Sequence, residues 1–163
     1  MSTATLERPG TETSTVHPQR AVVAVVVEWR GRIALFKRSQ SVGHERGLWH
    51  CVTGYLEPGA SPRQQALVEL EEEAGLTPQD LAGFEPGERL LISDDGGNPW
   101  LVHTFTAVST RRRLTINDEH DAYRWTVASK ISRFSNRVPW LDTVLQVALP
   151  AHRTSPDTAT KAA

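Results

Sequence analysis

Three glutamates stand close together in the sequence, in a segment whose pattern is that of a helix. Because successive helical residues are about 100° apart, Glu69, Glu72 and Glu73 share one arc of about 100°, while Glu71 points away to solvent. Like charges three and four positions apart repel, and anions in the last turn oppose the helix dipole. A divalent cation would reverse both penalties, and clustered carboxylates suit Mg²⁺ or Mn²⁺. The alternative is a solvated acidic face, although no lysine or arginine here is placed to offset the three charges.

The segment that carries these glutamates has signals for both ends of a helix. Ser61 can cap the first turn, Pro62 suits the first helical position, and Gln64 lies three residues after the cap. The helix is predicted to run to Ala74, with Gly75 as the terminating residue. The buried stripe beside the carboxylates should consist of Ala66, Leu67, Leu70 and Ala74.

The stretch from Gly54 to Leu76 resembles the Nudix box. That pattern is a glycine, five residues, a glutamate, seven residues, and then Arg-Glu-U-x-Glu-Glu-x-Gly-U, where U is a bulky aliphatic residue. The positions that match in unbroken register are Gly54, Glu69, Leu70, Glu72, Glu73, Gly75 and Leu76. The resemblance implies a member of the Nudix hydrolase superfamily.

The resemblance also implies roles for particular residues. Glu69 and Glu73 are the first-choice ligands for Mg²⁺ or Mn²⁺, Glu72 is the third carboxylate, and the Gly54 carbonyl oxygen is a further ligand. The general base is expected in the loop before the next strand, where Glu119 is preferred to Asp121 and the neighbouring His120 is interpreted as a solvated surface residue. Cleavage of a phosphoanhydride bond by water is the expected reaction.

Two positions depart from the family pattern. Ala60 stands where the box has its first glutamate, and Val68 stands where it has arginine. In the family these two side chains form a structural ion pair, so losing both leaves no unpaired charge. A misplaced carboxylate can cost about a hundredfold in rate. We therefore expect a slower enzyme, and a binding or regulatory module without turnover is the alternative.

Substrate contacts are sought outside the box. Arg46, in the loop before a strand, and Trp100, beside the Asn98–Pro99 turn, are candidates for binding a phosphate, base or sugar. His103 is a third candidate, although its alternation with Leu101 and Phe105 favours a packed side chain. A third function, prenyl diphosphate isomerisation, would need a catalytic cysteine, and Cys51 lies in an apolar run typical of a buried strand.

The elements that position these residues are mostly strands. Strands are predicted at 21–28, 33–36, 48–53, 90–93, 100–108 and 123–127, and a second helix at about 139–149. Together with the resemblance, this predicts an α/β fold, a Nudix-type α/β/α sandwich with a mixed sheet and a catalytic loop–helix–loop. One domain is expected over residues 20–149, between disordered tails at 1–19 and 150–163 that are rich in Ser, Thr, Ala and Pro.

Composition limits the remaining classes. Hydrophobic residues make up 39% and charged residues 23%, as in a globular protein, and the net charge is −1. No nucleic acid polymer is expected as a partner, because no global positive field would attract one. No stretch is long enough to span a membrane, and one cysteine favours the cytoplasm. The expected partner is a small phosphorylated substrate such as a nucleotide, and a homodimer is compatible with the resemblance.

Overall fold

The computed structural model describes residues 20–149, so both predicted tails lie outside the described residues. The elements, in chain order, are β1 (Arg20–Trp29), β2 (Arg32–Arg38), β3 (Trp49–His50), β4 (Val52–Leu56), α1 (Pro62–Ala74), η1 (Pro78–Asp80), β5 (Leu81–Pro86), β6 (Leu90–Ser93), β7 (Pro99–Ser109), β8 (His120–Thr126), η2 (Ala128–Arg133) and α2 (Leu141–Ala148). Here η marks a 3₁₀-helix. None of the helices in this part of the chain is long and apolar enough to cross a membrane.

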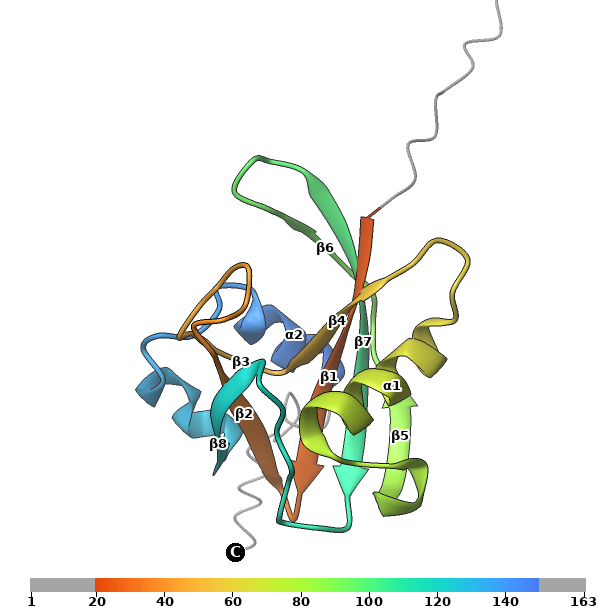
Figure 1. Cartoon of the computed structure of the whole chain (residues 1–163), viewed down its shortest axis with the longest axis vertical. Helices are drawn as coiled ribbons and strands as arrows, with labels where there is room; N and C mark the ends of the chain where they lie inside the picture. Colours follow the sequence, from red (N-terminus) through yellow and green to blue (C-terminus); the bar gives the residue numbers. More distant parts are fainter. Residues whose placement is uncertain (1–19, 150–163) are drawn as a thin grey trace, which may run out of the picture.

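The strands form one mixed sheet around β1 (Figure 1). The parallel strand β7 occupies one edge of β1 over almost its whole length. The other edge is shared by two antiparallel strands. β4 pairs with Ala21–Val25, whereas β2 pairs only with Glu28 and Trp29. β4 therefore pairs with the first half of this edge of β1, and β2 pairs with its last two residues. β2 also pairs with β3 and β8.

Two hydrophobic cores lie on opposite faces of this sheet, because alternate residues of β1 point to opposite sides. Val23, Val25 and Val27 belong to the core that α1 covers, which we call the α1-side core. Ala24 and Val26 belong to the α2-side core, which α2 covers. Figure 1 shows the two helices on the two sides of the sheet. The predicted α/β/α sandwich with a mixed sheet is confirmed.

Helix α1 begins and ends where its sequence signals predict. The Ser61 side chain accepts a hydrogen bond from the Gln64 amide, and Pro62 is the first helical residue. Gly75 ends the helix at a φ of 68°, and its amide donates to Glu71. This left-handed conformation is one that residues with a Cβ rarely adopt.

The sheet differs from the predicted strands in three places. The strand predicted at 48–53 is two short strands, β3 and β4, and β4 continues to Leu56. β5 was not predicted, because Gly83 and Pro86 break the usual strand signals, yet it pairs antiparallel with β7. β8 begins at His120, three residues before the predicted strand at 123–127. A register shift in its pairing with β2 explains this difference: Ala122 pairs with Lys37 and His120 with Arg38, so one extra residue of β8 interrupts the alternation.

Candidate functional site

Glu73 is the most unusual carboxylate of helix α1. It is only 1% exposed, and neither of its side-chain oxygens has a hydrogen-bond partner among the described residues. Burial, followed by the negative charges of Glu69 and Glu119, raises its pKa to about 10. A buried carboxylate without a partner is costly, so the metal-free site holds this group protonated at neutral pH. A divalent cation would take the place of that proton.

Glu69 lies one turn before Glu73 and is partly buried. The side-chain amide of Gln65 donates a hydrogen bond of 2.8 Å to Glu69 Oε1. Burial is the main cause that raises the pKa of Glu69. Gly54 lies against this carboxylate so closely that a Cβ at position 54 would overlap it. The glycine in the middle of β4 and the glutamate on the helix therefore fit each other.

Glu72 does not join this pair in the structure. Its side chain is exposed, although its charge still contributes to the raised pKa of Glu69. Within residues 20–149, no group of three or more His, Cys, Asp or Glu side chains is arranged to hold a metal ion. The donor set nevertheless fits Mg²⁺ or Mn²⁺, because these ions take a few carboxylates and complete their shell with carbonyl, phosphate and water oxygens.

His120 is a residue that sequence reasoning missed. It is buried on β8 rather than solvated in a loop, so that interpretation was wrong. Its Nε2 lies 3.6 Å from Glu73 Oε1, and burial lowers its pKa to about 4, so the imidazole is neutral at pH 7. The bulge in β8 turns it toward helix α1. No signal in a single sequence could locate this bulge.

Glu119 is exposed and comes just before β8. Its carbonyl oxygen accepts a hydrogen bond of 2.8 Å from the Ser39 amide, and its own amide donates to Asn117 Oδ1. Its negative charge contributes to the raised pKa values of both Glu69 and Glu73. Glu119 therefore lies on the side of the sheet that faces the two carboxylates.

Arg38 is the buried cation of this region. It is 7% exposed, and its guanidinium donates two hydrogen bonds of 3.3 Å to the His44 carbonyl. Its positive charge acts against the raised pKa of Glu73. It also adds to the burial that lowers the pKa of His50 to about 3. Arg38 thus gives the acidic site a nearby positive charge, which sequence reasoning did not single out.

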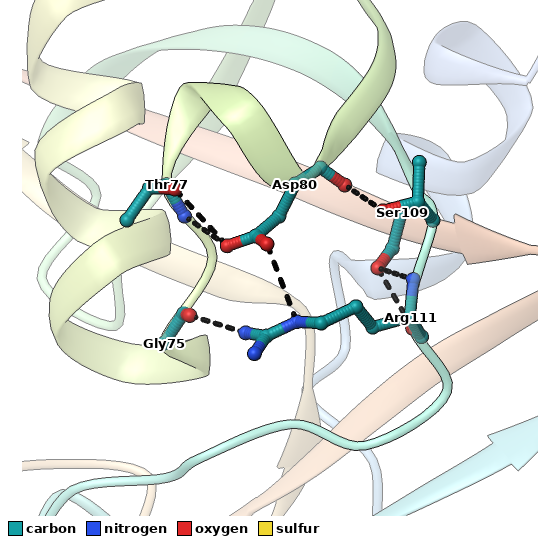
Figure 2. Close-up of polar contacts among 6 residues, drawn as sticks. Gly75, Thr77, Asp80, Ser109 and Arg111 are labelled. Carbon is teal, nitrogen blue, oxygen red and sulfur yellow. Dashed lines mark hydrogen bonds and ion pairs between the residues drawn. The ribbon is translucent and has the colours of Figure 1, made fainter.

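The end of helix α1 is tied to the segment that leads to β8. Figure 2 shows Arg111 reaching from the end of β7 to the Gly75 carbonyl, with a hydrogen bond of 2.6 Å. Arg111 Nε also lies 3.5 Å from Asp80 Oδ1, and the other Asp80 oxygen accepts from the Thr77 amide. These contacts fix the last turn of α1 against the segment that carries Glu119.

The three predicted substrate contacts are not brought together. Arg46 is exposed, and its Nε donates to the Val42 carbonyl at 2.7 Å. Trp100 packs beside Tyr55, with ring centroids 5.7 Å apart. Since Trp100 alternates in phase with Val102 of the α2-side core, it faces away from helix α1. His103 is partly buried in phase with Phe105, and burial lowers its pKa.

Two positions that depart from the Nudix pattern lie on the surface. Ala60 and Val68 are both exposed, and Val68 is 46% exposed. Neither can form the ion pair of the family pattern. The hydrogen bond from Gln65 is the side-chain contact that holds Glu69 in this chain.

Comparison with known proteins identifies relatives of this chain. The family model of the NUDIX domain matches residues 17–146 of the sequence. An octanoyltransferase from Myxococcus xanthus is 38% identical over 119 residues, which are 66% of this chain but only 30% of that protein. The nucleoside triphosphatase NudI from Klebsiella pneumoniae is 29% identical over 122 residues, which are 71% of this chain and 86% of that protein.

Among solved structures, an Ap4A hydrolase from C. elegans superimposes with a TM-score of 0.62. The match covers 78% of this chain and 93% of that one, at 18% sequence identity. At this identity the likeness shows a shared fold.

Proposed function

Because the chain belongs to the NUDIX family of pyrophosphohydrolases, we propose that it hydrolyses a phosphoanhydride bond in a nucleoside di- or triphosphate or a nucleotide-linked metabolite, with Mg²⁺ or Mn²⁺ as cofactor. The names of its relatives support a nucleotide substrate, since one is a nucleoside triphosphatase and another an Ap4A hydrolase. The products would be a nucleoside monophosphate, or another phosphomonoester, and the remainder of the substrate.

The observation that carries this proposal is the state of Glu73. A helix that buries a glutamate among alanine and leucine side chains, without any hydrogen bond, loses stability by doing so. The negative charge of Glu69 beside it makes ionisation of Glu73 more costly still. Destabilising groups of this kind are typical of functional sites. Binding a hard cation is the function that would use both carboxylates.

In the proposed mechanism, Glu69, Glu73 and the Gly54 carbonyl oxygen would hold the ion, and Glu72 would add negative charge from the exposed side. When bound, the ion would neutralise phosphate charge and lower the pKa of water. Gln65 keeps the Glu69 carboxylate in place through its hydrogen bond.

Glu119 is proposed as the general base. It accepts a proton from water while that oxygen forms a bond to phosphorus and the anhydride oxygen leaves with its electron pair. Its exposed position next to the buried pair supports this role. Arg46, Trp100 and His103 remain proposed substrate contacts, and Arg46 has the freest access to a phosphate because its side chain is exposed.

The test is a product assay over nucleotides, nucleotide sugars and prenyl diphosphates, with and without Mg²⁺ or Mn²⁺. We expect metal-dependent release of a phosphomonoester by the wild type. Glu73→Gln and Glu69→Gln should each lose at least a hundredfold in turnover. Glu71→Gln is the matched control, because Glu71 is exposed on the same helix. Full metal-dependent turnover by Glu73→Gln would show that the site is assigned wrongly.

The second candidate is a NUDIX-fold binding module with little or no turnover. The exposed Ala60 and Val68, which cannot form the family's ion pair, favour it. Binding of a nucleotide without any product in the same assay would establish it.

Isomerisation of prenyl diphosphates has less support. Cys51 is 1% exposed, and burial raises the pKa of its thiol far above the ordinary range, so it is no nucleophile or acid at neutral pH.

A further inference from the structure

A pocket lies on the part of the sheet formed by β2, β3 and β8. Its volume is about 550 Å³, within the range of sites that bind small molecules, which is about 300–1,000 Å³. Its wall comes from the ends of these strands, from η2 and from the residues that follow η2. None of the proposed catalytic or metal-binding residues is part of this wall.

The part of this pocket formed by β3 and η2 lies on the α2 side of the sheet. Trp49 and Phe134, two of its wall residues, pack against the α2-side core, whereas Trp125, a third, packs against the α1-side core. The residues after η2 are fixed in place, because the Trp49 amide donates to the Asn136 carbonyl at 2.8 Å and the Val138 amide donates to the Trp49 carbonyl. The β3 and η2 part of the pocket is therefore on the opposite face of the sheet from helix α1 and its carboxylates.

The charge of the wall is entirely positive. Arg32 of β2, Arg124 of β8, and Lys130 and Arg133 of η2 contribute to it, and no aspartate or glutamate does. The ion pairs found between residues 20 and 149 belong to His44, Arg111, His120 and Arg137, which lie outside this wall. Four cations from three elements, gathered around one hollow in a chain of net charge −1, create a local field that attracts anions.

The rest of the wall is aromatic and polar. Trp49 and Phe134 pack edge to face with ring centroids 5.1 Å apart and form the aromatic part of the wall on the α2 side. Ser135 and Asn136 add side chains that can donate and accept hydrogen bonds. Aromatic faces bind flat rings, and arginine binds phosphate through its planar fork of donors.

We propose that this pocket is a second, non-catalytic site for a small phosphorylated molecule that carries a flat ring, of the nucleoside monophosphate class. The cations bind the phosphate, and the aromatic wall and the two polar side chains bind the ring. This site needs no divalent ion, since its charge is already opposite to that of the ligand. It stands independently of the hydrolysis proposed for the Glu73 site.

The test is calorimetric titration of the full chain with AMP, adenosine or inorganic phosphate in EDTA, so that the carboxylate site has no metal. We expect AMP to bind more tightly than either adenosine or phosphate alone. The double variant Arg124→Ala/Arg133→Ala should weaken AMP binding about tenfold or more, because each substitution removes a hydrogen bond from a guanidinium to the charged phosphate. Arg63→Ala/Arg89→Ala removes the same charge elsewhere and should leave the affinity unchanged.

Two further variants keep the outcome decisive. Lys130→Ala serves as a single substitution in case the double variant folds poorly, and thermal unfolding of each variant checks the fold. Glu69→Gln/Glu73→Gln should retain AMP binding in EDTA. The proposal is overturned if the wild type does not bind AMP at millimolar concentration, or if phosphate alone binds as tightly. It is equally overturned if the loss appears in the glutamate variant and not in the arginine variant.

Discussion

Replacing Glu73 by glutamine should change how the free energy of unfolding of the metal-free protein depends on pH. In the folded protein the pKa of Glu73 is raised from 4.5 to about 10, first by burial and then by Glu69. A raised pKa means that the folded state holds a proton that the unfolded state has lost at neutral pH. The stability that this proton gives is fully present below pH 4.5 and is lost as the pH rises toward 10.

The magnitude is best measured between pH 7 and 9. Burial lowers the pKa of His50 to about 3 and of His120 to about 4, so both histidines are neutral throughout this range and do not contribute. When the folded protein holds one proton more than the unfolded protein, the free energy of unfolding falls by about 1.4 kcal/mol for each pH unit. From pH 7 to pH 9, the free energy of unfolding of the wild type should therefore fall by up to about 3 kcal/mol more than that of Glu73→Gln. This corresponds to roughly 5–10 °C in melting temperature.

The assay is thermal or urea unfolding of wild type, Glu73→Gln and the exposed control Glu71→Gln, in EDTA at pH 7, 8 and 9. The burial of Cys51 also lowers stability at the alkaline end, but it does so in all three proteins and cancels in the comparison. Added Mg²⁺ should stabilise the wild type more at pH 9 than at pH 7, since binding needs the ionised carboxylate. It should have little effect on Glu73→Gln.

Parallel stability curves for wild type and Glu73→Gln would refute this reasoning. They would mean that Glu73 ionises at an ordinary pH and is in contact with water. The proposed metal site would then lose the buried charge on which it rests. Divergence of Glu71→Gln from the wild type would show that the effect belongs to helix charge in general and not to burial at position 73.

Three further predictions test the surroundings of the carboxylates. Gly54→Ala should lower turnover at least a hundredfold, because its Cβ would overlap Glu69. The control Gly43→Ala places its Cβ in open space and should keep full turnover. Equal rates for the two variants would refute the fit between strand and helix. Gln65→Ala, compared with the exposed Gln64→Ala, should cost about 1 kcal/mol in stability and tenfold or more in turnover, since Glu69 loses its hydrogen bond. Unfolding and rate measurements on Arg111→Ala should show a melting temperature lower by about 3 °C, because the bond to Gly75 is lost. Arg113→Ala should not change it, and an equal loss there would contradict the anchoring role.

Helix α1 could be predicted from the sequence because its determinants are local. Ser61, Pro62 and Gly75 act within one turn of the ends, and the stripe of Ala66, Leu70 and Ala74 repeats with the period of the helix. The hairpin of β1 and β2 is equally local. Its turn places Arg30 and Gly31 at positive φ, as the glycine in the sequence indicates.

The surroundings of the carboxylates could not be predicted in the same way. From helical geometry alone, Glu69, Glu72 and Glu73 are equivalent edge residues. Only the packing of α1 on the sheet buries Glu73, leaves Glu72 exposed and sets Glu69 against Gly54. His120 reaches Glu73 because of a bulge in a strand that pairs with β2, far away in the sequence.

The sequence by itself determined the helix, its ends, the order of its carboxylates and the spacing that links them to Gly54. These depend on residues within a few turns of one another. The tertiary structure alone decided which carboxylate is buried, which histidine faces it and which cations surround the pocket formed by β2, β3 and β8. Burial and electrostatic environment are sums over neighbours that the chain brings together from distant segments, so no local pattern contains them.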